Sequence, residues 1–154
     1  MRILTLAAIT LFTSAAFAQT AGPGISWDGT STNSAGSFLP TCQVLPVTMV
    51  AGETVTITVW GDILSPFGLF ASTAATQSLQ IPGLGGCLAL DPPAFTVAFG
   101  VLTLVTPCLS CPPGLQPLTF QLPANLPPGT VLAVQGAALG SGSPAFTSAI
   151  RAQS

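Results

Sequence analysis

Two cysteines separated by two residues, in the segment PCLSCPPG at residues 107–114, have a spacing that fits three kinds of chemistry. A C-x-x-C pair can be a redox dithiol, half of a zinc site, or a short disulfide in a loop. A reactive dithiol needs a helix N-terminus or a cation close to the first thiolate. Pro-Pro-Gly follows Cys111 directly, so no regular helix can begin there, and no cation lies nearby in the sequence. The sequence therefore argues against redox chemistry at Cys108 and Cys111.

The remaining two cysteines decide between a zinc site and structural disulfides. A zinc site needs four ligands, often as two close pairs, whereas Cys42 and Cys87 lie far apart and the chain has no histidine. Four cysteines allow three disulfide pairings. We expect Cys108–Cys111 as a local link in a loop and Cys42–Cys87 as the long bridge. A crossed pairing such as Cys87–Cys108 would keep the structural role of the cysteines.

The first residues have the composition of an export signal. A positive charge at Arg2, an apolar run over residues 3–12 and a small-x-small sequence before Gln19 are typical of a cleaved signal peptide. The apolar run is shorter than the roughly 20 residues of a membrane span, so we expect no transmembrane segment after cleavage. Export leads to an oxidising compartment, where paired cysteines form disulfides. The expected division is a signal peptide at residues 1–18, a flexible lead-in at 19–37 and a folded domain at 38–154.

Charge is nearly absent: 4% of the residues are charged, against about 25% in an average soluble protein. Once Arg2 leaves with the signal, Arg151 is the only cation, and the sequence has no lysine, histidine or tyrosine. Nucleic acids and anionic membranes are bound by clusters of Lys and Arg, so we exclude both as partners. A serine hydrolase lacks its base here, and a Schiff-base enzyme lacks its amine.

The four carboxylates leave only one enzyme class open, because two carboxylates suffice for a glycosidase. Each of them has a simpler explanation in turn chemistry. Asp28 precedes a glycine, Glu53 lies in the turn before a strand, Asp62 follows a glycine at the end of that strand, and Asp91 precedes two prolines. Their isolation also argues against a calcium loop. We therefore predict a protein that is not an enzyme and has no cofactor or metal.

Alternation predicts the fold. Residues 54–60 alternate Val or Ile with Thr and Trp60, the period-two pattern of a half-buried strand. Similar short runs recur at intervals of roughly 8–12 residues between Gly and Pro clusters, which is typical of a sandwich or barrel. Residues 21–37 resemble a loose segment with Trp27 as its anchor. We predict an all-β, immunoglobulin-like antiparallel sandwich of seven or eight strands, at residues 44–50, 54–60, 67–72, 87–90, 94–105 (one bent strand or two), 117–122, 130–139 and 145–152.

Several motifs in this pattern resemble a known family. The segments TCQVLPVTMVAGETVTITVWG, GGCLALDP and LTFQLPANLPPGTVLAVQGAAL, with TSAI near the end, resemble small secreted bacterial β-sandwich proteins of planctomycete-type genomes, which mostly lack an assigned activity. The resemblance covers most of the exported chain and supports a sandwich with a Cys42–Cys87 bridge. The chain departs from the family by adding Cys108 and Cys111, and by having TSAI where the family tends to end near SN. The resemblance supplies no active site.

These observations lead to a function without catalysis. We expect a secreted structural or adhesive module of the cell surface or extracellular space, with surface polymers or other envelope proteins as possible partners. An alternative is a carbohydrate- or protein-binding module that uses Trp60 as a stacking platform on the threonine face of its strand. A third hypothesis, an extracellular thiol-disulfide enzyme, rests on Cys108 and Cys111 alone.

Overall fold

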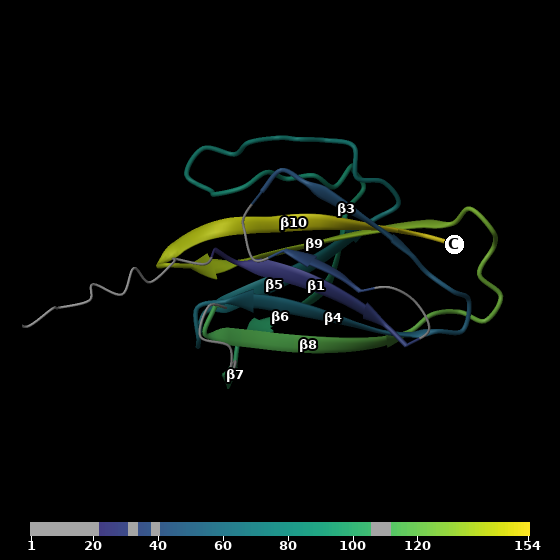
Figure 1. Cartoon of the computed structure of the whole chain (residues 1–154). Coiled ribbons are helices and arrows are strands. Elements are labelled where there is room, and N and C mark those ends of the chain that lie inside the picture. The colour runs from purple at the N-terminus through teal and green to yellow at the C-terminus, as the bar shows by residue number, and fades with distance from the viewer. Residues whose placement is uncertain (1–21, 31–33, 38–40, 106–111) are drawn as a thin grey trace, which may run out of the picture.

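The chain folds as two β-sheets packed face to face (Figure 1). The structure is a computed structural model that describes residues 22–30, 34–37, 41–105 and 112–154. The described residues form ten strands and no helix, and so none that could span a lipid bilayer. The predicted all-β sandwich is confirmed. The expected signal peptide, Cys108 and Cys111 lie outside the described residues.

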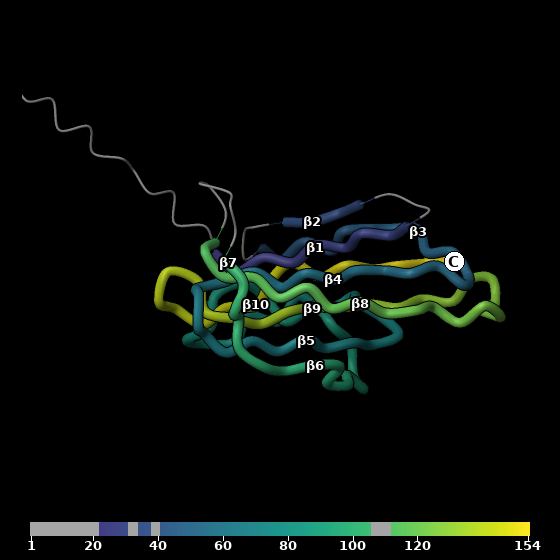
Figure 2. The backbone as a smooth tube through the Cα atoms, turned by 90° about the horizontal axis from the view of Figure 1, so that it is seen from below, coloured from purple at the N-terminus to yellow at the C-terminus, as the bar shows by residue number. Residues whose placement is uncertain are grey.

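Each sheet has five strands; Figure 1 shows one layer above the other, and in Figure 2, seen from below, the two layers overlap. Neighbours in the first sheet are all antiparallel. The second sheet is antiparallel except for its β3–β10 pair. The first sheet has the order β2 (Ala35–Ser37), β1 (Gly24–Gly29), β4 (Thr54–Gly61), β8 (Gly114–Gln121) and β7 (Leu104–Val105). The second has the order β3 (Val44–Thr48), β10 (Ser143–Gln153), β9 (Val131–Gly140), β5 (Pro66–Ser72) and β6 (Phe95–Val101).

The alternation in β4 places the core between the sheets. Val55, Ile57 and Val59 are buried, while the intervening threonines face outward and are half exposed. Trp27 of β1 lies opposite Ile57 in the ladder and is fully buried. Apolar side chains of both sheets meet these residues in one cluster, which removes their surface from water and drives the packing of the layers.

The second sheet is also covered on its outer face. Residues 73–94, which we call the cover loop, connect β5 to β6 and pack across β9 and β10 (Figure 1). Ala89 and Leu90 of the cover loop form a second apolar cluster with Ala133 and Ala149 of the sheet. Because β9 and β10 are buried on both faces, their burial does not alternate as it does in β4.

Two regions differ from the sequence expectation, and the sheets have ten strands where seven or eight were predicted. In the expected loose lead-in, residues 24–29 form β1, which pairs with β4 along its whole length, and residues 35–37 form β2, which pairs with β1. Residues 87–90, expected as a strand, belong to the cover loop, where Leu88 forms only an isolated bridge with Leu79. Residues 24–29 and 87–90 are both short, contain large apolar residues and have Gly or Pro close by. Such segments pack on a sheet either as a strand or as a loop, and long-range contacts decide between the two.

Candidate functional site

The two cysteines among the described residues are joined. Cys42, which precedes β3, and Cys87 of the cover loop form a disulfide with a Cα–Cα distance of 4.9 Å across 45 residues of sequence. This confirms the predicted long bridge. Cys87 is fully buried. Cys42 is exposed. Because both sulfurs are joined in a disulfide, neither is a thiolate, so this pair fixes the cover loop to the start of β3 and has no nucleophile to supply.

A buried amide completes the attachment of the cover loop. Gln135 of β9 is 1% exposed. Its Oε1 accepts a hydrogen bond from the Ala89 N–H at 3.0 Å, and its Nε2 donates to the Cys87 carbonyl at 2.6 Å and the Thr147 carbonyl at 2.8 Å. The amide thus binds two backbone groups of the cover loop and one of β10 at a buried position, where polar groups need a partner. A glutamine in the middle of an apolar strand was the sequence signal for this contact, but it does not reveal the partners.

Asp62 holds the turn between β9 and β10. Ser141 and Gly142 form this two-residue turn, and both have positive φ angles, 53° and 76°, as a type I′ hairpin requires. The Asp62 carboxylate accepts hydrogen bonds from the Ser141 N–H at 3.1 Å and the Gly142 N–H at 2.8 Å. The carboxylate therefore fixes a hairpin some 80 positions further along the chain.

The other carboxylates also accept hydrogen bonds locally. Buried Glu53 accepts from the Val50 N–H at 3.0 Å, Asp28 accepts from the Ser34 hydroxyl, and Asp91 accepts from two residues of the cover loop, Thr76 and Gln77. Glu53 and Asp62 lie at opposite ends of β4, roughly 30 Å apart at 3.3 Å per residue, whereas a glycosidase pair lies within about 10 Å. The described residues contain no group of three or more His, Cys, Asp or Glu placed to hold a metal.

Trp60 and the threonines of β4 share the outer face of the first sheet, which we call the hydroxyl face. Thr56 hydrogen-bonds Thr119 of β8 at 3.3 Å, and Thr54 donates to Gln121 at 2.8 Å, so the hydroxyls bind the neighbouring strand. Trp60 is partly exposed, with its indole nitrogen buried. The structure thus brings together the residues expected to form a stacking face, and their ligand binding stays a prediction.

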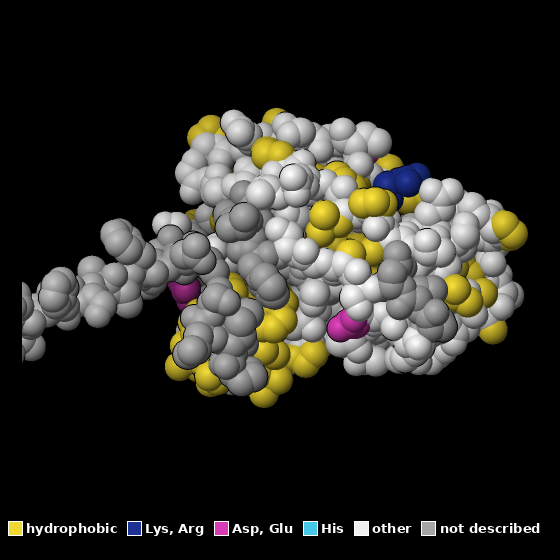
Figure 3. Space-filling view, in the orientation of Figure 1, with side chains coloured by type: hydrophobic (Ala, Val, Ile, Leu, Met, Phe, Trp, Pro, Cys, Tyr) yellow, Lys and Arg dark blue, Asp and Glu magenta, His cyan; other side chains and the backbone are white. Residues whose placement is uncertain are grey.

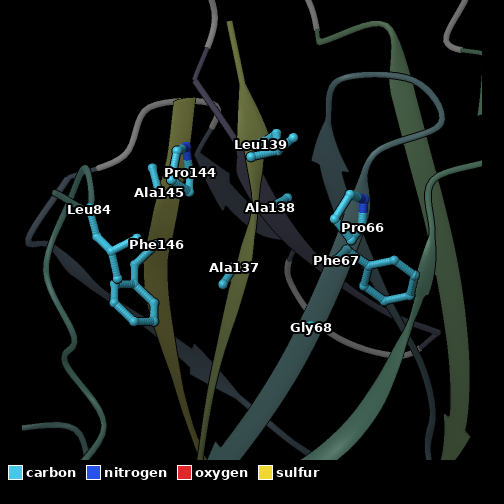
Figure 4. Close-up of a pocket in the computed structure, with 10 residues that line it drawn as sticks. All are labelled: Pro66, Phe67, Gly68, Leu84, Ala137, Ala138, Leu139, Pro144, Ala145 and Phe146. Atoms are coloured by element: carbon cyan, nitrogen blue, oxygen red, sulfur yellow. The ribbon is translucent and has the colours of Figure 1, made fainter. Parts of the chain in front are cut away.

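A shallow apolar depression lies on the outer face of the second sheet (Figure 4). It has a volume of about 250 Å³ and crosses β5, β9 and β10. Figure 4 shows Leu84 of the cover loop beside Phe146 of β10 on one side, and Pro66 with Phe67 of β5 on the other. The lining residues come from four separate segments, so sequence reasoning did not find this feature.

The strand β6 carries the aromatic side chain with the highest exposed fraction in the described part of the chain. Phe99 is 85% exposed and Phe95 is 59% exposed, and the neighbouring valines of β6 are also exposed. Leu104 and Val105 of β7 continue this apolar surface. In Figure 3, hydrophobic side chains gather at the end of the molecule where Figure 1 places β7, and the few charged groups lie apart from one another. We call the side of β6 that pairs with no described strand, together with its exposed side chains, the β6 edge.

The fold and the disulfide place the protein in a structural class: a two-sheet β-sandwich with a loop that a disulfide attaches to it. No family model matches the chain, and neither a curated protein nor a solved structure is significantly similar to it. The function must therefore be argued from the residues themselves.

Proposed function

We propose that the protein is an exported, non-catalytic β-sandwich module with a structural or adhesive role at the cell surface or in the extracellular space. The main support is the use of its polar groups. In the described part of the chain, the four carboxylates accept hydrogen bonds in turns and loops, and Cys42 is joined to Cys87. The chemistry that remains on the surface is that of threonine hydroxyls and apolar side chains, which suits contact with other polymers.

Within this proposal the sandwich is of the immunoglobulin-like kind. The orders β1-β4-β8-β7 and β10-β9-β5-β6 correspond to the A-B-E-D and G-F-C-C′ orders of that architecture. The chain has no tyrosine for a tyrosine corner, and its disulfide joins a loop to the region before β3 instead of joining the two sheets. The Cys42–Cys87 pair is also the pair implied by the resemblance to secreted bacterial sandwich proteins, and it supports that kinship.

Peptide mass mapping under non-reducing conditions tests the proposal. The protein is purified separately from medium, envelope and cytosol of the producing cells. We expect it in the first two fractions, beginning at Gln19, with Cys42 linked to Cys87 and Cys108 linked to Cys111. A full-length cytosolic protein with reduced cysteines would contradict export. A reactive thiol at Cys108 or Cys111 in the folded protein would instead favour a thiol-disulfide enzyme.

The hydroxyl face supports a second candidate, a carbohydrate-binding module. Its support is the partly exposed Trp60, which lies on the same face of β4 as three threonines. A glycan array compares the wild type with Trp60→Ala and with Phe99→Ala, an exposed aromatic on the other sheet, as the matched control. Binding that is lost only in Trp60→Ala would establish this function, and equal binding by all three proteins would exclude Trp60 as its platform.

A further inference from the structure

The β6 edge has the features of a strand that pairs with another strand. β6 pairs with β5 on one side, and no strand of the described residues pairs with its other side. Its backbone N–H and C=O groups on that side are therefore available as a template for a further strand. We infer that this strand is the β6 of a second copy of the chain. The second sheet of each copy would then join the second sheet of the other across a two-fold axis.

The composition of β6 lacks the usual protection of an edge. Natural edges carry charged side chains, proline or β-bulges, which oppose pairing with another chain. Residues 94–105 contain neither a charge nor a proline. The one interruption is a register shift against β5, where Leu69 pairs with Ala98 and Phe70 pairs with Thr96. The run from Ala98 to Val101 continues beyond this shift and is long enough for a short antiparallel ladder.

A second copy is the occupant that fits this edge best. A two-fold interface places the same surface on both sides, so each side must be complementary to itself. A neutral apolar strand meets this condition, because no like charges oppose each other when it pairs with itself. Phe99 and Val101 face outward opposite Gly68 and Pro66 of β5, so they would contact their own counterparts on the outer face of the joined sheet.

The other edges of the two sheets are poorer templates. β2 has three residues and β7 has two, too few for a stable ladder. β3 contains Pro46, which has no N–H to donate. Among the described strands, β6 therefore combines length, an open side and apolar composition.

The exposed apolar surface around β6 sets an upper limit on the area of this interface. At their exposed fractions, the large side chains of β6 and β7 present on the order of 600 Å² in each copy, and covering all of it in two copies would bury about 1,200 Å², the lower end of stable specific interfaces. Val97 also lines an apolar cavity of about 190 Å³ between the sheets, together with Phe120 and Leu122. A strand added beside β6 would shield Val97 and that side of the cavity from water.

Sedimentation velocity of the purified chain from residue 19 onward tests the inference. We expect a concentration-dependent dimer of the wild type and a monomer of the double variant Phe99→Lys/Val101→Lys, with a dissociation constant raised at least roughly 100-fold, because four lysines would meet at the axis. The matched control is Leu79→Lys, which changes a 52% exposed leucine of the cover loop and should remain dimeric. Circular dichroism and thermal unfolding confirm that each variant folds.

Three results would overturn the inference. These are a wild type that stays monomeric up to about 100 µM, an open-ended polymer in place of a dimer, and a dimer that survives the lysine pair. A milder variant, Phe99→Thr/Val101→Thr, keeps strand propensity and should also weaken the dimer. The inference deepens the proposed structural role and rests on it for its meaning in the cell. Sedimentation tests the β6 edge alone, whereas mapping of cell fractions tests the role, so the two can fail separately.

Discussion

The two edges of the second sheet differ in how they are protected. At one edge, β3 contains Pro46, lies beside Arg151 of β10, and follows a residue joined by a disulfide to the cover loop. At the other edge, β6 has no proline, no charge and an 85% exposed phenylalanine. One edge is closed by backbone chemistry and cross-links, whereas the other is open along most of its length. The comparison indicates that a chain with almost no charge can protect a sheet edge with a proline and a disulfide, and that β6 has neither.

The contacts near β3 form one connected group. The Cys42–Cys87 disulfide, the Gln135 amide and a hydroxyl pair between Thr41 and Ser148 all lie where the cover loop and the start of β3 meet β9 and β10. Removing them one at a time measures how the protection of this edge is divided among a covalent bond, a buried amide and a single hydroxyl contact.

The largest effect is expected from removal of the disulfide. The variant Cys42→Ser/Cys87→Ser should have a free energy of unfolding about 4 kcal/mol lower than that of the wild type, because the disulfide closes a long loop and restricts the unfolded chain. Urea denaturation under non-reducing conditions measures this loss. Hydrogen exchange should become faster in β3 and the cover loop through local opening, and the most protected core amides should also exchange faster, because they open through the destabilised global unfolding.

The control for this variant is Cys108→Ser/Cys111→Ser, which removes the predicted short link. Its loss should be about 2 kcal/mol, since a short loop restricts the unfolded chain less. A larger loss in the control than in Cys42→Ser/Cys87→Ser would contradict the importance assigned to the long bridge.

The next effect concerns the buried amide. Gln135→Leu keeps nearly the same volume but leaves the Ala89 N–H and the carbonyls of Cys87 and Thr147 without their partner. We expect a loss of about 3 kcal/mol in unfolding free energy, because each unsatisfied buried group costs about 1–3 kcal/mol and the loop can relax in part. Gln80→Leu, at an exposed position of the same loop, is the control and should change little. Equal stabilities for the two variants would show that the cover loop does not depend on Gln135.

The sequence predicted the contacts that depend on local pattern. The alternation in residues 54–60 was sufficient for β4 and for the inward side of Val55, Ile57 and Val59. The pairing of Cys42 with Cys87 followed from the export signal, the cysteine spacing and the family resemblance. In each case the information lies in neighbouring residues or in the small number of possible partners.

Contacts between distant segments could not be predicted in the same way. Asp62 binds a turn some 80 positions away, and nothing near Asp62 in the sequence indicates that turn. Residues 94–105 showed their strand propensity, but only the order of the sheet shows that β6 is an edge. Likewise, Gly24–Gly29 has a strand's composition at its centre and becomes β1 only because β4 offers it a partner. Local sequence pattern thus predicts where the described strands lie better than it predicts which strands pair with each other.

A smaller effect should come from the hydroxyl pair. Thr41 and Ser148 share a hydrogen bond of 2.7 Å between their side-chain oxygens, and Ser148 is fully buried. Thr41→Val keeps the shape of the side chain and removes the hydroxyl, so we expect a loss of about 1 kcal/mol. Thr73→Val, at an exposed position of the cover loop, should stay within about 0.5 kcal/mol of the wild type. If Thr41→Val matches this control in thermal unfolding, Ser148 is satisfied by its other contacts.

The smallest effect on stability, but a large one on association, is expected from Pro46→Val. Valine restores an N–H to β3 and suits a strand, while the unfolded chain gains freedom, so the unfolding free energy should change by no more than about 0.5 kcal/mol. The β3 edge then becomes a second template, and a dimer already joined through β6 would have a free β3 edge at each end. Sedimentation should therefore show species larger than a dimer, increasing with concentration.

Two companion variants separate the two edges. Pro46→Lys also restores the N–H but adds a charge, and it should remain dimeric because like charges oppose pairing at β3. Pro46→Val combined with Phe99→Lys/Val101→Lys should form only dimers, now through β3. If Pro46→Val sediments like the wild type, the proline is not what closes this edge, and Arg151, which lies opposite Pro46 in the ladder, becomes the residue to replace next. Either result would show whether one missing N–H accounts for the difference between the two edges.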